Sequence, residues 1–144
     1  MYSKNKEEYV VSACMAGIPC RYDGTCKTNE YVLNLVNCGK AHAMCPEVLG
    51  GLSTPRDPAE IVEGRVITRE GMDVTKEYES GALKVLDYCK KHNIKKAILM
   101  DKSPSCGFRI YDGTFSGNII NKKGITAQLL TDNDIEVISS SDIK

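Results

Sequence analysis

Three stretches of the chain share one pattern, a short run of apolar residues followed by a turn that carries a cysteine. The runs and their thiols are 9–14 with Cys14, 41–45 with Cys45, and 97–106 with Cys106. Short runs of this kind predict strands buried on both faces of a sheet. If the strands are parallel neighbours, their carboxyl ends border one crevice, which is where such sheets bind ligands. We therefore expect three thiols from distant parts of the sequence to converge there.

Apolar residues at helical spacing separate these runs. The further elements that this spacing predicts are helices at 28–36, 73–93 and 125–130 and a last strand at 135–138. Thr28 or Asn29 is expected to cap the first helix, and Asp73 the second. Strands that alternate with helices predict an α/β fold. We expect a single Rossmann-like domain over residues 1–144, with a mostly parallel sheet and helices on both faces.

Turn-forming residues interrupt this alternation. Residues 46–58 contain three prolines and two glycines, which exclude a long regular element. In residues 59–71, two short β-prone runs flank Glu63 and Gly64, and we expect a small hairpin insertion there. Turn-rich loops at 17–24 and 109–117 follow the first and third thiols.

Charge and hydropathy argue against two classes of binding partner, nucleic acids and membranes. The 144 residues include 19 basic and 19 acidic side chains, so the formal net charge is zero. Such a chain has no field to hold a nucleic-acid backbone non-specifically, which argues against a nucleic-acid partner. The first eight residues are polar and carry no signal-peptide core, and no stretch is long and apolar enough for a membrane helix. We expect a cytoplasmic protein with no membrane partner.

The chain contains seven cysteines but no C-x-x-C motif. In a reducing compartment, thiols at this density are more often metal-binding or catalytic than bridged. Without C-x-x-C, a thioredoxin dithiol and the usual zinc knuckle are excluded. Any metal site must therefore combine distant ligands. Cys38 lies at the end of the first predicted helix, and we interpret it as a small, partly buried residue. Cys89 lies on the apolar face of the second predicted helix, and we interpret it as a packing residue.

Three interpretations of the converging thiols remain open from the residues alone. Three thiolates are one fewer than a [4Fe-4S] cluster normally takes, and the iron left without a protein ligand is an open Lewis-acid position for a soft sulfur atom. A zinc site completed by His42 or Cys20 is the second interpretation. The third is a set of unrelated buried cysteines.

Several polar side chains are expected beside the thiols. Glu47 follows the second thiol by two residues and suits a general acid or base, although a Glu at this position is also an ordinary helix-start residue. Ser103 and Ser105 precede the third thiol and either bind substrate or close the turn. Arg56, held between prolines, is suited to a phosphate or carboxylate, or is simply solvated. His42 lies inside a predicted strand and is a core or surface residue rather than a base.

Six blocks of sequence, in the same order, resemble the thiouracil desulfidase-like family known as domain of unknown function 523. The blocks are 12–14, 17–24, 45–51, 54–56, 103–107 and 111–117. Together they cover nearly the whole chain, and their combination is specific although no single block is. Two departures from the family pattern, Met15-Ala16 and Asp57, lie near the expected site and bear on the choice of substrate.

The resemblance implies a Rossmann-like domain that holds a [4Fe-4S] cluster through Cys14, Cys45 and Cys106. It implies that the thiocarbonyl sulfur of a thiolated pyrimidine, of the 2-thiouracil or 4-thiouridine type, binds the iron that lacks a protein ligand. Water then attacks the ring carbon and sulfide is released without net electron transfer. Glu47 and Ser103 match positions with catalytic roles in that family.

On physical grounds we assign proton transfer to Glu47 and the orientation of substrate or water to Ser103. We expect Arg56 and Ser105 to bind substrate. Cys20 also lies in one of the matching blocks, but the resemblance assigns no role to it. The alternative function is a non-catalytic module that senses or carries iron or sulfide through a cluster or zinc.

Overall fold

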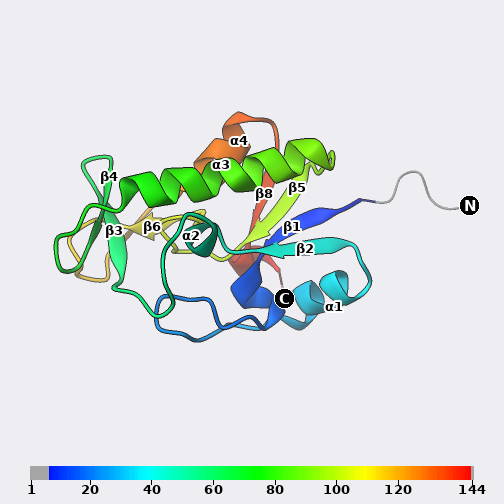
Figure 1. The fold of residues 1–144 in the computed structure, drawn as a ribbon, viewed down its shortest axis with the longest axis horizontal. Coiled ribbons are helices and arrows are strands. Elements are labelled where there is room, and N and C mark those ends of the chain that lie inside the picture. Colours follow the sequence, from blue (N-terminus) through cyan, green and yellow to red (C-terminus); the bar gives the residue numbers. More distant parts are fainter. Residues whose placement is uncertain (1–6, 144) are drawn as a thin grey trace, which may run out of the picture.

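A four-stranded parallel sheet forms the centre of the computed structural model, which describes residues 7–143 (Figure 1). In spatial order, the strands are β2 (Ala41–Met44), β1 (Tyr9–Ser12), β5 (Lys96–Leu99) and β8 (Glu136–Ser139). Each neighbouring pair runs parallel. The predicted mostly parallel α/β sheet is therefore confirmed, and the first three predicted strands are neighbours.

Helices cover both faces of this sheet. The main helices are α1 (Glu30–Asn37), α3 (Thr75–Lys91) and α4 (Ile125–Asp132). Side chains of successive strand residues point to opposite faces, so each strand contributes to two cores. Val10 and Leu99 pack in one core with α3 and α4, whereas Val11 and Ile98 pack in the other core with α1.

The helix starts differ in how closely they follow the prediction. The side chain of Asn29 accepts a hydrogen bond from the Val32 N–H at 3.1 Å, so Asn29 is the predicted N-cap of α1. The second helix starts later than expected, because Val74 is the N-cap of α3. Asp73 instead accepts from the Thr75 N–H at 2.9 Å and closes the preceding turn.

The first two strands end earlier than their apolar runs suggest. β1 ends at Ser12, and Cys14 lies in a single 3-10 turn, η1 (Ala13–Ala16). Cys45 is the N-cap of the short helix α2 (Pro46–Leu49), which begins with proline at a position where no N–H is needed. In both cases the thiol stands just beyond the sheet.

Two hairpins and a short terminal turn complete the fold. The predicted hairpin is confirmed as β3 (Ala59–Val62) and β4 (Arg65–Thr68). A second hairpin, β6 (Ile110–Tyr111) and β7 (Ile119–Ile120), forms where we expected only a loop, because two-residue strands leave no periodic pattern. The turn η2 (Ser140–Asp142) follows β8. Within residues 7–143, no helix is long and apolar enough to cross a membrane.

Cys38 and Cys89 belong to helices and not to the strand ends. Cys89 is buried on α3, as predicted. Cys38 is exposed at the end of α1, where its thiol donates to the Asn34 carbonyl at 2.8 Å, so the expectation of a partly buried residue is wrong.

Two glycines bring the backbones of α2 and α3 into direct contact. A Cβ atom on Gly81 would overlap the carbonyl oxygen of Pro46, and one on Gly50 would overlap the carbonyl oxygen of Glu77. Glycine is a poor helix former, by about 1 kcal/mol relative to Ala. Its presence within α3 is explained by this close approach, which fixes α2 against the longest helix.

We therefore expect Gly81→Ala to destabilise the fold although Ala favours helix. The added methyl group must separate α2 from α3, and overpacking of this kind costs about 2 kcal/mol. Urea unfolding of the variant measures the cost, with Glu79→Ala at an exposed position of the same helix as control. A Gly81→Ala variant more stable than wild type would contradict the close packing.

Candidate functional site

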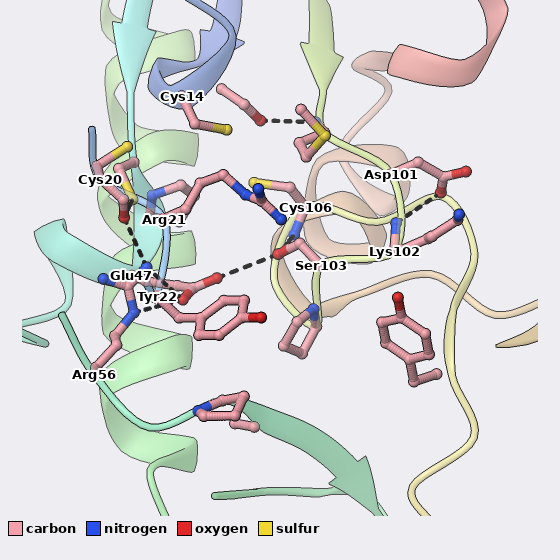
Figure 2. Close-up of a pocket in the computed structure, with 18 of the residues that line it drawn as sticks. Cys14, Cys20, Arg21, Tyr22, Glu47, Arg56, Asp101, Lys102, Ser103 and Cys106 are labelled. Atoms are coloured by element: carbon pink, nitrogen blue, oxygen red, sulfur yellow. Dashed lines mark hydrogen bonds and ion pairs between the residues drawn. The ribbon is translucent and has the colours of Figure 1, made fainter. Parts of the chain in front are cut away.

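The carboxyl ends of β1, β2 and β5 open into one cavity of about 540 Å³ that four thiols line (Figure 2). The thiols are those of Cys14, Cys20, Cys45 and Cys106, and all four are free. Cys14, Cys20 and Cys106 are buried and Cys45 is half-buried. The structure thus brings the three cysteines of the strand ends together, and a loop adds a fourth.

The fourth thiol, Cys20, lines the cavity beside the other three. The Cys45 thiol donates to the Cys20 carbonyl at 3.8 Å. The neighbouring Cys14 thiol contributes most to raising the pKa of Cys20 to about 11. The neighbouring Cys20 thiol, together with burial, raises the pKa of Cys45. Burial raises the pKa of Cys106 to about 12. These thiols are protonated at neutral pH, and binding a metal displaces their protons.

A mononuclear zinc site involving His42 is contradicted by the structure. Nε2 of His42 lies 2.7 Å from the Glu8 carboxylate, and Nδ1 lies 2.8 Å from the Tyr88 hydroxyl. His42 does not line the cavity. Over residues 7–143, no three or more Cys, His, Asp or Glu side chains are grouped closely enough to hold a single metal ion.

The thiols do fit an iron-sulfur cluster. The donors that line the cavity from the three strand ends are all soft thiols, which is the ligand type that iron-sulfur clusters take. In a cubane cluster each thiolate binds a different iron, so the ligands surround the cluster instead of meeting at one ion. Cys14, Cys45 and Cys106 reach the cavity from separate elements, as such a group requires.

Glu47 faces the cavity from the first turn of α2, where it forms a polar cluster with Arg56 and Ser103 (Figure 2). Oε1 of Glu47 accepts from Arg56 Nε at 2.9 Å and lies 2.8 Å from Arg56 Nη2. Oε2 accepts from the Ser103 hydroxyl at 3.2 Å. Two residues that are 56 positions apart in the chain are therefore joined at the cavity wall.

Arg56 directs its guanidinium at protein acceptors. Nη1 donates to the Ser53 carbonyl and to the Thr54 hydroxyl, each at 3.0 Å. Nη2 donates to the Cys20 carbonyl at 2.9 Å in addition to its contact with Glu47. All five guanidinium N–H groups thus have partners within the protein. The arrangement suits a residue that holds Glu47 and the Cys20 loop in place, rather than one that awaits a substrate anion.

The two serines before Cys106 have different surroundings. The Ser103 oxygen accepts from the N–H groups of Ser105 at 3.1 Å and of Cys106 at 3.0 Å, which leaves its proton for Glu47. Ser105 is fully buried, and its hydroxyl lies 2.7 Å from that of Thr126. Ser105 is not among the residues that line the cavity, so the structure does not place it where we expected a substrate contact.

Asp101, which the sequence did not single out, organises the loop that carries Ser103 and Cys106. Its carboxylate accepts from the N–H groups of Lys102, Phe108 and Arg109, from the Arg109 guanidinium and from the Ser141 hydroxyl. Burial raises the pKa of Asp101, but these bonds, that of the Arg109 N–H first, outweigh burial and lower the pKa to about 2. In the sequence, the only signal for this role was an acidic residue at the start of the loop with Arg109 later in the same loop.

The amino end of α4 also holds this loop in place. The N–H groups of Gly124, Ile125 and Thr126 donate to carbonyl oxygens of the loop at 2.8 Å each. A Cβ on Gly124 would lie 2.5 Å from the Pro104 carbonyl oxygen, so the approach requires glycine. Free N–H groups of a helix start are thereby satisfied by the segment that presents Cys106.

Cationic residues outnumber acidic ones by one in the lining of the cavity. Its lining includes five cationic residues, Arg21, Lys27, Arg56, Arg69 and Lys102, and four acidic ones, Glu47, Asp57, Glu60 and Asp101. The acidic groups accept hydrogen bonds from the protein. Among residues 7–143, no carboxylate forms an ion pair with Lys27, Arg69 or Lys102. These three cations remain available to an anionic group.

Comparisons with known proteins agree on one family. A family described as 2-thiouracil desulfurase matches residues 9–142. The uncharacterized protein YbbK of Bacillus subtilis (strain 168) is 45% identical over 145 residues, which are 93% of this chain and 96% of YbbK. A solved structure of the [4Fe-4S]-dependent thiouracil desulfidase TudS superposes with a TM-score of 0.92 at 44% identity, covering 96% of this chain and 93% of TudS.

The lowered pKa of Asp101 predicts how stability depends on pH. The carboxylate contributes stability above its ordinary pKa of 3.8, and that contribution is lost as the pH falls toward its folded pKa of about 2. The shift corresponds to about 2 kcal/mol of unfolding free energy. Asp101→Asn is expected to lose about this amount at pH 7 and to show a shallower decline below pH 4. Urea unfolding across this pH range measures the loss at pH 7 and the decline below pH 4, with the exposed Asp87→Asn as control. Equal pH slopes of the unfolding free energy in wild type and Asp101→Asn would contradict the stabilising role of the Asp101 carboxylate.

Proposed function

The chain belongs to the 2-thiouracil desulfurase family, and we propose on that basis that it is a [4Fe-4S]-dependent enzyme that removes sulfur from a thiolated pyrimidine. The observation that carries the proposal is that three cysteine thiols and the Glu47–Ser103 pair face one cavity. Thiols supply a place for the cluster, and the pair supplies groups for moving a proton. The expected cytoplasmic location accords with the reduced state that free thiols and a cluster require.

Cys14, Cys45 and Cys106 are the residues that would hold the cluster. When bound through three thiolates, a [4Fe-4S] cluster supplies one iron without a protein ligand, a Lewis acid suited to thiocarbonyl sulfur. Cys20, which lines the same cavity, remains as a neighbouring thiol.

The overall reaction replaces a C=S bond with a C=O bond. Water adds its oxygen to the ring carbon, and its two protons leave with the sulfur as hydrogen sulfide, so no electrons are gained or lost. Glu47 is the side chain that takes the proton from the attacking water and returns it to the departing sulfur. Arg56 holds the Glu47 carboxylate in place through two N–H groups during both steps.

Ser103 orients the substrate or the attacking water. Because the Ser103 oxygen accepts two backbone N–H groups, the hydroxyl has a fixed position and only its proton is free to turn. In the structure that proton faces Glu47. When the Ser103 proton turns from Glu47 to a water molecule or to a pyrimidine oxygen, it positions that group beside the carboxylate.

We infer further that the substrate carries a negative charge beyond the pyrimidine ring. Lys27, Arg69 and Lys102 line the cavity without a carboxylate partner among the described residues. The charge excess favours a thiolated nucleotide, such as 4-thiouridine monophosphate, over the free base. A polynucleotide is disfavoured because the chain as a whole carries no net charge.

Anaerobic reconstitution with iron and sulfide tests the proposed activity. We expect the reconstituted protein to convert 4-thiouridine monophosphate and 2-thiouracil to the oxygenated products with one sulfide released per turnover. The value of kcat/KM is expected to be higher for the monophosphate, by about tenfold for a single well-placed ion pair. Loss of substrate absorbance and sulfide release are the measurements. A stable cluster with no turnover on any thiopyrimidine would reject the proposal.

Replacing Glu47 separates an enzyme from a module that only senses or carries iron or sulfide. Glu47→Gln keeps the shape of the side chain but removes the base, and we expect kcat to fall by about 10²–10⁴. The iron content of the reconstituted variant should equal that of wild type. Glu70→Gln, at an exposed position, is the control. Unchanged turnover in Glu47→Gln would remove Glu47 from the mechanism.

A further inference from the structure

Residues 111–117 have no part in the proposed reaction steps, although three of them line the cavity. Tyr111 ends β6, and Phe115 and Gly117 belong to the turn that leads to β7. Phe115 is half-buried, and its side chain has no polar atom to satisfy. A residue of this kind offers a neighbour only the flat, apolar face and the edge of its ring.

The turn that carries Phe115 is held against the first hairpin. Glu60 of β3 is 9% exposed, and its Oε1 accepts from the N–H groups of Gly113 at 3.0 Å and of Phe115 at 3.1 Å. A Cβ on Gly113 would lie 2.6 Å from the Ile61 carbonyl oxygen, so the turn and β3 are in direct contact. Phe115 is thereby held at a φ of 57°, a left-handed conformation that a bulky residue rarely adopts. Such conformations persist only where the surroundings fix them, and they cluster at active sites and ligand clamps.

A cation lies over the Phe115 ring. Arg69, the residue after β4, also lines the cavity, and its guanidinium carbon lies 5.9 Å from the ring centroid, close enough for a cation–π contact. The other phenylalanine of the chain, Phe108, has a similar partner, since Lys123 Nζ lies 4.7 Å from its ring centroid. Phe108 does not line the cavity. The two rings therefore differ in position and not in their type of contact.

The proposed reaction requires the pyrimidine ring to be held in one plane. Water adds to a trigonal ring carbon from above or below the ring, so the tilt of the ring determines whether that carbon faces a water beside Glu47. A hydrogen bond to the ring edge, such as one from Ser103, acts within the plane and leaves the ring free to tilt. Stacking of one face on an aromatic side chain fixes the plane, and any pyrimidine has a face that can stack.

We propose that Phe115 is a substrate-binding residue whose ring stacks on the pyrimidine and sets its plane relative to Glu47. This inference rests on the proposed function and deepens it, because it names the contact that recognises the ring itself. Phe115 suits this role better than the neighbouring Tyr111, because Glu60 holds its backbone and Arg69 lies over its ring.

Phe115→Leu tests the contact, with Phe108→Leu as matched control. Leu keeps most of the apolar volume but removes the flat ring, and Phe108 also has a cation over its ring while lying outside the cavity lining. For Phe115→Leu we expect kcat/KM to fall about tenfold for 4-thiouridine monophosphate and for 2-thiouracil alike, because both substrates present the same ring.

A conservative variant separates stacking from a structural role. Phe115→Tyr, which restores the ring, and Phe108→Leu are each expected to stay within about threefold of wild type in kcat/KM. Iron content should match wild type in all three variants. Unchanged kcat/KM in Phe115→Leu, a loss of iron in that variant, or a Phe115→Tyr variant as impaired as Phe115→Leu would each overturn the role.

Binding of uridine monophosphate tests the ring contact without turnover. The reconstituted wild type and Phe115→Leu are titrated by calorimetry with uridine monophosphate and with ribose 5-phosphate, which has the sugar and the phosphate but no ring. We expect the variant to bind uridine monophosphate about tenfold more weakly and ribose 5-phosphate as wild type does. Equal losses for the two ligands, or no loss for uridine monophosphate, overturn the role of Phe115. Ring-dependent binding in a wild type without turnover on thiopyrimidines instead overturns the proposed function alone.

Discussion

Parallel pairing of β1 with β2 on one side and β5 on the other determines where every group of the site lies. Ser12 pairs with Met44, and Val11 with Ile98, so the three strands end at nearly the same level. Whatever follows each strand therefore enters the same space. Cys14 and Cys45 follow at once, and Cys106 returns to the cavity on the loop after β5. A shift of one residue in either pairing would turn the core side chains to the wrong face, so burial of both faces protects this alignment.

Close backbone contacts fix the loops of the site relative to the strands and helices. The glycine contact between α2 and α3 fixes the helix that bears Glu47, and the amino end of α4 fixes the loop that bears Ser103 and Cys106. Asp101 gathers the same loop around one carboxylate. Rigid elements thus hold the groups that the proposed chemistry needs at fixed distances, which is how active sites avoid reorganisation during reaction.

The sequence predicted the parts of the fold that depend on local pattern. Apolar runs indicated the strands, helical spacing indicated α1, α3 and α4, and Glu63-Gly64 indicated the hairpin. The convergence of Cys14, Cys45 and Cys106 followed from strand order once parallel pairing was assumed. What it did not predict depends on contacts between loops: the burial of Ser105 against Thr126, and the commitment of Arg56 to Glu47 and the Cys20 carbonyl. No periodic pattern encodes such contacts, since they arise only when the whole chain has folded.

The central claim is that Cys14, Cys45 and Cys106 together hold a four-iron cluster. Iron and acid-labile sulfide per chain, measured after anaerobic reconstitution, test it most directly. Wild type and Cys38→Ser, whose thiol is exposed and distant from the cavity lining, are expected to bind about four of each. The variant with Ser at positions 14, 45 and 106 is expected to bind none. Wild-type amounts of iron and sulfide in that triple variant would contradict the account.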